Sequence, residues 1–102
     1  MIQFDVPAVV PADPQANISD LLVERVKATP ERPLFAVPEG DGWRDITGAQ
    51  FQSQVIALAK GLVAAGVEPG DKVGFIARTT YDWTLVDFAI FFAGAVMVPI
   101  YE

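Results

Sequence analysis

The chain of 102 residues contains no cysteine and no histidine. Without cysteine it can form no disulfide bond, no thiolate metal site and no cysteine nucleophile. Without histidine it lacks the side chain that most often acts as a general base or binds a metal, so every histidine-dependent triad is excluded. The absence of cysteine also fits the cytoplasm. We therefore expect a cytoplasmic protein with little catalytic chemistry in these residues.

Basic residues and long apolar runs are also scarce. Lys and Arg number 7 against 13 Asp and Glu, which gives a net charge of −6. Acidic charge repels phosphate backbones, so we expect no nucleic-acid partner. The run from Phe88 to Tyr101 is apolar but shorter than the roughly 20 residues that cross a bilayer. The N-terminus has no basic stretch followed by an apolar one. We expect neither a signal peptide nor a transmembrane segment.

What the chain does have is a strand–helix–strand pattern near its C-terminus. Residues 72–77 form a short apolar run, residues 81–93 have helical periodicity, and residues 95–101 form a second apolar run. This order predicts a βαβ unit whose strands pair in parallel. A parallel pair needs cover on both faces, and the chain stops at Glu102, directly after the second strand. The pattern fits a compact α/β domain or an incomplete piece of a larger one.

The first part of the chain is predicted to be an extended arm followed by a hairpin. Residues 1–16 contain three prolines, at 7, 11 and 14, which disfavour a helix. This arm is either a loosely held terminus or a segment that docks on a neighbouring subunit. Further along, the apolar residues 34–37 and the alternating residues 43–46 flank the turn cluster 39–42. That arrangement predicts a β-hairpin.

Two further helices have clear start signals. Asn17 can cap a helix over 18–28, and Thr47 with a glutamine three residues later forms a capping-box pattern before a helix over 47–65. Helical spacing predicts the buried face of the second of these helices: Phe51, Val55, Leu58 and Leu62. The same spacing predicts the main apolar face of the helix over 81–93: Leu85, Phe88, Ala89 and Phe92. Val86, Ile90 and Phe91 broaden this face, so we expect the helix to be buried on most sides.

Polar residues that could carry chemistry are few and isolated. Arg78, Thr79 and Thr80 follow the carboxyl end of a predicted strand, where open α/β sheets bind ligands, although many such loops bind nothing. Asp82 and Asp87 are five residues apart, too far round a helix to share a site, and a helix cap and a solvated or strand-facing charge explain them better. No complete catalytic constellation is visible.

The serines, glycines and tryptophans do not change this interpretation. Ser19 and Ser53 have no base to activate them. No Gly-x-Gly follows a strand to open a helix, and no Gly-Lys-Ser/Thr occurs. Turns and packing explain the remaining candidates: Gly66, Gly70, Gly74, Trp43 and Trp83. We therefore expect no catalytic, cofactor-binding or metal-binding residue within 1–102.

Four segments, in order and at matching spacing, resemble the N-terminal portion of the adenylate-forming superfamily. They are residues 43–51 (WRDITGAQF), 62–67 (LVAAGV), 68–73 (EPGDKV) and 92–99 (FAGAVMVP). The first is similar to the opening T-Y-x-E-L motif of that family, with Asp45, Ile46 and Phe51 departing from its usual residues. The stretches YDWTLVDFA and VPIYE are most similar to bacterial long-chain fatty-acid–CoA ligases.

The resemblance implies a partial N-terminal subdomain of the adenylate-forming fold, with 17–102 as the incomplete start of the large N-terminal domain. It implies a parent AMP-forming ligase that uses ATP, Mg²⁺ and CoA to activate a fatty acid as an acyl-adenylate and then form its thioester. The phosphate loop, acidic contact and lysine that the family uses for this all lie outside 1–102, so no residue role carries over.

From this resemblance we expect the 102 residues alone to be inactive and to bind none of these cofactors. A homodimer through the arm and a membrane-peripheral location are further hypotheses for the parent enzyme. The competing class is a free-standing, non-catalytic α/β binding or interaction module. That class explains the lack of catalytic residues but not the four matching segments.

Overall fold

The computed structural model describes residues 1–101 and shows a mixed α/β fold. Its elements, in chain order, are α1 (Ile18–Ala28), β1 (Pro33–Glu39), β2 (Gly42–Thr47), α2 (Gly48–Ala64), β3 (Lys72–Phe75), α3 (Tyr81–Phe92) and β4 (Val96–Pro99). Strands β1 and β2 form an antiparallel hairpin, and β3 and β4 form a parallel pair joined by α3. The predicted hairpin, parallel βαβ unit and three helices are confirmed.

Both predicted capping patterns hold the starts of helices α1 and α2. The Asn17 side chain accepts a hydrogen bond from the Asp20 N–H at 3.3 Å, and the Asp20 carboxylate accepts one from the Asn17 N–H at 3.0 Å. Thr47 and Gln50 make the same reciprocal pair at α2, at 3.2 and 2.9 Å. These contacts involve residues three apart, so the local sequence is sufficient to predict them.

The parallel strands are shorter than the sequence pattern predicts. Their paired register runs from Lys72↔Val96 to Phe75↔Pro99, and the remaining apolar residues of 72–77 and 95–101 lie outside it. A strand is defined by backbone pairing, and beyond Pro99 the pairing is reduced to one hydrogen bond, from the Ile100 N–H to the Phe75 carbonyl at 2.9 Å. The apolar runs therefore predict strands that are longer than β3 and β4 are in the structure.

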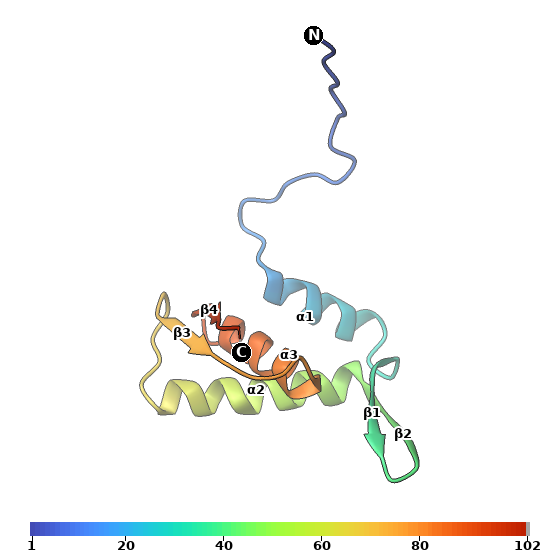
Figure 1. Ribbon diagram of the computed structural model, residues 1–102, viewed down its shortest axis with the longest axis vertical. Coiled ribbons are helices and arrows are strands. Elements are labelled where there is room, and N and C mark those ends of the chain that lie inside the picture. The colour runs from blue at the N-terminus through green and yellow to red at the C-terminus, as the bar shows by residue number, and fades with distance from the viewer. Residues whose placement is uncertain (102) are drawn as a thin grey trace.

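The core lies where α2, α3, α1 and the hairpin meet (Figure 1). Leu22, Ile46, Phe51 and Val55 form its buried cluster, with Ile46 and Phe51 each 1% exposed. The ring of Phe51 packs against Phe35 with ring centroids 4.7 Å apart. Helix α3 contacts both α2 and β4, so it links this core to the parallel strands.

Helix α3 is buried or half-buried at every position except Asp82, as its apolar sequence predicts. Ala89 and Ile90 are fully buried, whereas Leu85 and the other large residues of the predicted main face are only half-buried. Because α3 packs against several elements, its buried surface is wider than one helical stripe. Trp43 was expected to pack in a core or an interface; it is 73% exposed on the hairpin, which excludes the core.

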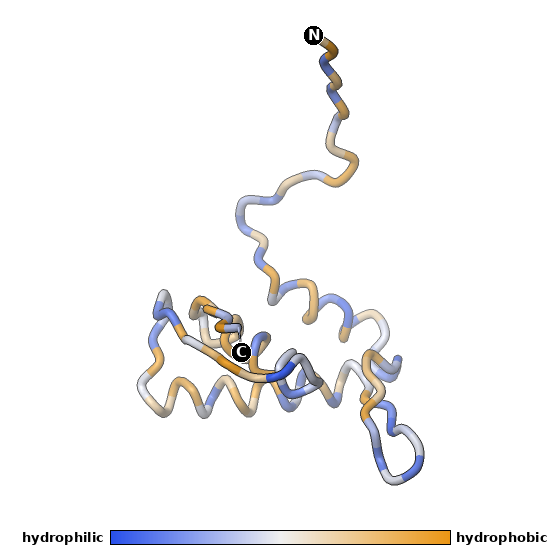
Figure 2. Tube along the Cα trace, viewed as in Figure 1, coloured by the Kyte–Doolittle hydropathy of each residue, from blue (hydrophilic) through white to orange (hydrophobic). Residues whose placement is uncertain are grey.

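The N-terminal arm extends away from the rest of the molecule (Figure 1). Residues 1–16 contain no helix or strand, and every one of them is exposed. In Figure 2 hydrophobic and hydrophilic residues alternate along the first part of this arm. Ile2, Phe4 and Val6 are 82–87% exposed, so the arm presents apolar side chains to solvent.

Candidate functional site

The loop after β3 is the place where the sequence suggested a ligand. Arg78, Thr79 and Thr80 follow this strand, and all three are exposed. Thr80 is the N-cap residue of α3, but its side chain makes no capping hydrogen bond. The loop is therefore open to solvent.

The fold places this loop beside the hairpin, which the sequence did not indicate. A pocket of about 360 Å³ lies between them, lined by Val37, Pro38, Arg44, Ile46, Gln54, Thr80, Tyr81 and Asp82. Of the predicted loop only Thr80 takes part. The other polar groups come from β2 and α2, which are consecutive, and from the first turn of α3, which is distant from both in sequence. No local motif could have marked them as neighbours.

Two polar side chains of this pocket bind each other. The Tyr81 hydroxyl donates a hydrogen bond to Gln54 Oε1 at 2.5 Å. Burial raises the pKa of Tyr81, the negative charge of Asp82 raises it further, and the positive charge of Arg44 opposes both. Tyr81 is therefore a neutral phenol at physiological pH. Arg44 also forms an ion pair with Glu39 at 3.2 Å on the exposed hairpin.

This arrangement can hydrogen-bond a small polar group, and no pair of a nucleophile with an activating base stands out among its side chains. Nucleophilic catalysis needs a nucleophile with an activating base in reach, and the lining residues include neither serine nor cysteine nor histidine. Asp82 is exposed, whereas Asp87 is half-buried and its pKa is raised by burial. Among residues 1–101 no group of three potential metal ligands comes together.

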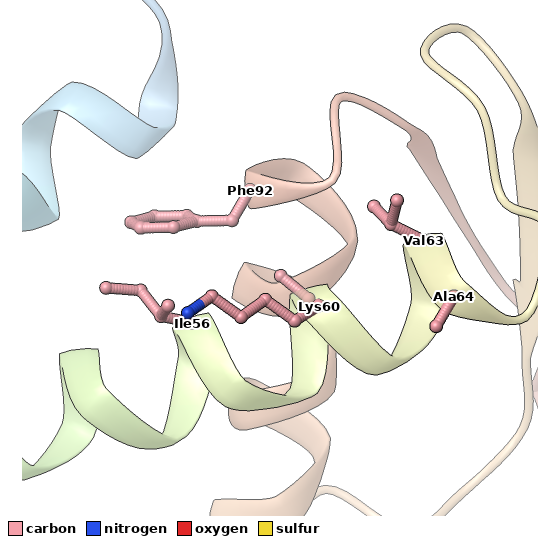
Figure 3. A pocket seen from close by; sticks show the side chains of 6 residues that line it. Ile56, Lys60, Val63, Ala64 and Phe92 are labelled. Carbon is pink, nitrogen blue, oxygen red and sulfur yellow. The ribbon is translucent and has the colours of Figure 1, made fainter.

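A second pocket is apolar and lies between α2 and α3 (Figure 3). It has a volume of about 400 Å³ and is lined by Ile56, Ala59, Lys60, Val63, Ala64 and Phe92. Ala59 is buried, while Ile56 and Val63 are 38% and 55% exposed. The pocket is thus a groove on the surface of the helical layer, with one cationic side chain among apolar ones.

Known proteins of similar sequence and similar fold identify the family of this chain. Long-chain-fatty-acid–CoA ligase FadD15 of Mycobacterium bovis is 35% identical over 102 residues, which are 100% of this chain and 17% of that protein. The crystal structure of CmiS6 matches with a TM-score of 0.74 and 32% identity, over 94% of this chain and 25% of that one.

The N-terminal subdomain of Klebsiella oxytoca NpsA, solved in complex with 3-hydroxybenzoyl-AMSN, matches with a TM-score of 0.71 and 28% identity. That match covers 81% of this chain and 20% of that subdomain chain. Together these neighbours define the class: part of the N-terminal subdomain of an adenylate-forming ligase. The chain belongs to the AMP-binding enzyme family, whose model matches residues 22–102.

The matched region is a small part of the related proteins. The chain spans 17% of the length of the Mycobacterium bovis ligase.

Within residues 1–101 no helix is both long enough and apolar enough to cross a membrane.

Proposed function

We propose that these residues are the scaffold portion of an ATP-dependent ligase that activates long-chain fatty acids as acyl-adenylates and transfers the acyl group to CoA. The observation that carries this proposal is the 35% identity to a long-chain-fatty-acid–CoA ligase along all 102 residues, the arm included. The family match over residues 22–102 supports the ligase class independently. In this proposal residues 17–102 begin the large N-terminal domain, and residues 1–16 are an arm that precedes it.

The surface of the parallel strands supports a scaffold role. Parallel strands normally have both faces covered, yet Val96, Val98 and Ile100 are 38–51% exposed on β4 and directly after it. A pair of strands with this much apolar surface is suited to being one edge of a larger sheet. Such a sheet would position residues elsewhere in the ligase.

The proposed reaction places demands that these residues do not meet by themselves. Adenylation requires the fatty carboxylate and ATP to be held in line, and charge to be neutralised as pyrophosphate leaves. Mg²⁺ would supply part of that neutralisation, but we assign none of residues 1–101 to it because they contain no cluster of acidic ligands. We propose that binding of ATP, Mg²⁺ and CoA lies with other residues, and that the 102 residues alone are inactive.

Two finer proposals concern assembly and location. The exposed apolar side chains of the arm, among them Phe4 at 87% exposure, are suited to docking on a second subunit, which would make the ligase a homodimer. We also propose a cytoplasmic enzyme with peripheral contact to membranes, where long-chain fatty acids reside. Light scattering of the whole protein, with and without Phe4→Ser, measures the mass in solution and so tests the homodimer. Sedimentation with lipid vesicles measures membrane binding and so tests the peripheral location.

The activity is tested on the whole protein that contains this chain. It is incubated with ATP, Mg²⁺, CoA and saturated fatty acids of increasing length, and acyl-CoA and pyrophosphate are quantified. We expect acyl-CoA formation that favours long chains. Without CoA, hydroxylamine should trap an activated acyl group. Pyrophosphate release with short acids or aromatic acids only would refute the long-chain assignment while keeping the ligase class.

The alternative is a free-standing α/β binding module, favoured by a polar pocket whose side chains can hydrogen-bond a small polar group. The intact mass of the native polypeptide separates the two. A mass near 11.0 kDa would favour the module, and a mass several times larger would favour the ligase. Calorimetry adds a second test, because micromolar, Mg²⁺-dependent binding of ATP to the 102 residues would contradict the scaffold proposal.

A further inference from the structure

The three helices of this fold do not begin in the same way. Helices α1 and α2 each start with a capping box, in which two residues three apart exchange side chain–backbone hydrogen bonds. Helix α3 has no such box, because the side chain of its N-cap residue, Thr80, makes no capping hydrogen bond. The hydrogen bond from the Thr84 N–H to the Thr80 carbonyl is 3.4 Å long, beyond the usual range of about 2.7–3.2 Å. Local interactions therefore hold the start of α3 only weakly.

The loop that leads into α3 adds little anchoring of its own. It follows the carboxyl end of β3, the position where open α/β sheets bind ligands. Arg78, Thr79 and Thr80 are all exposed. Neither Arg78 nor Thr79 takes part in a backbone hydrogen bond within residues 1–101. A segment with an exposed backbone and few hydrogen bonds opens at a low cost in free energy, so the loop depends on an anchor from elsewhere in the fold.

Tyr81, the first residue of α3, provides a long-range anchor. Its hydroxyl donates a hydrogen bond to Gln54 Oε1 on α2, across 27 residues of sequence. Its ring lies edge-on to the rings of Phe35 and Phe51, with ring centroids 5.2 and 5.9 Å away. The packing of the ring brings the hydroxyl to α2, and the hydrogen bond then ties the start of α3 to that helix.

We propose that this hydrogen bond is a latch: the Tyr81 hydroxyl, held by Gln54, fixes the first turn of α3 and the end of the loop after β3 against α2, in place of a local cap. When the latch opens, the rest of α3 stays packed, because Ala89 and Ile90 further along the helix are fully buried. Both partners line the polar pocket, so the same opening frees two hydrogen-bonding groups there. The latch rests on contacts inside this fold and does not depend on the proposed ligase activity.

Hydrogen exchange of the whole protein that contains this chain, read at single residues by mass spectrometry, tests the latch. The Thr84 amide reports opening of the first turn, because its partner is the Thr80 carbonyl. The Ala93 amide donates to the Ala89 carbonyl at 3.0 Å and reports the far end of α3. In Tyr81→Phe, which keeps the packed ring, we expect exchange about threefold faster at Thr84 and unchanged at Ala93. An equal rise at both amides, or no rise at Thr84, would overturn the proposal.

Four further variants assign the effect to this pair of side chains. Gln54→Leu removes the acceptor and should raise exchange at Thr84 as much as Tyr81→Phe does. The double variant should exchange no faster than either single one, because the same bond is lost in all three. Two controls should change nothing: Gln52→Leu, the same change elsewhere on α2, and Tyr101→Phe, which removes a hydroxyl from a 93% exposed residue. Additive effects of the two latch variants, or an equal rise in either control, would refute the latch.

Discussion

Phe51 is the side chain on which the packing of the hairpin and two helices converges. It is 1% exposed, and its ring centroid lies 4.7 Å from that of Phe35, 5.6 Å from Phe88 and 5.9 Å from Tyr81. These partners come from β1 and from two turns of α3. Replacing Phe51 by alanine therefore removes contacts between three elements at once.

The expected cost of Phe51→Ala is about 3–5 kcal/mol, the usual range for truncating a fully buried phenylalanine. A small domain has only about 5–15 kcal/mol of stability, so this change removes a large share of it. At about 4–8 °C per kcal/mol, the melting temperature should fall by about 12 °C or more. Urea unfolding followed by far-UV circular dichroism measures the free energy of unfolding directly.

Trp43→Ala is the matched control for this prediction. Trp43 is also a large aromatic residue, but it is 73% exposed. We expect its truncation to change the free energy of unfolding by less than about 1 kcal/mol. A loss for Trp43→Ala equal to that for Phe51→Ala would refute the reasoning, because it would show that burial in this fold does not set the cost.

Two smaller predictions concern a glycine and an aspartate. Gly94 has φ +76° and an added Cβ would lie 3.4 Å from Pro69, so Gly94→Ala should lower the free energy of unfolding by about 1–2 kcal/mol. The control is Gly61→Ala, because Gly61 lies within α2 with open space where its Cβ would be. In the same unfolding experiments Gly61→Ala should be neutral or stabilising. Burial raises the pKa of the Asp87 carboxyl, so the folded protein holds the proton of this group more tightly than the unfolded chain does. The stability that the protonated carboxyl contributes is present below its pKa in the unfolded chain and is lost as the pH rises through its pKa in the folded protein. Asp87→Asn should flatten that decline, and an unchanged pH profile of unfolding would contradict it.

Local signals in the sequence were sufficient for the elements that depend on neighbouring residues. The capping boxes at Asn17 and Thr47 place the starts of α1 and α2 correctly, because each pair of partners is three residues apart. Gly66, which the sequence assigns to a turn or to packing, has a positive φ of +106° just after Ala65, the C-cap residue of α2. A glycine is favoured there because other residues rarely adopt this backbone conformation.

Contacts between distant segments were outside the reach of these signals. The polar pocket joins Arg44, Gln54 and Tyr81 from three elements, and the hydrogen bond between Tyr81 and Gln54 spans 27 residues. The aromatic character of Trp43 suggested packing in a core or an interface, and its exposed place on the hairpin excludes the core. Such outcomes depend on how elements are arranged in space, which periodicity along one element does not contain.

By itself, the amino-acid sequence determined which segments are helical or extended, that β3 and β4 pair in parallel, and which family the chain resembles. All three rest on local chemistry: caps, apolar period and short motifs. The tertiary structure alone decided that Ile90 is buried while Leu85 is only half-buried, and that α2 and α3 leave a groove beside Lys60. Burial and concavity are properties of several elements packed together, so only their arrangement in space could show them.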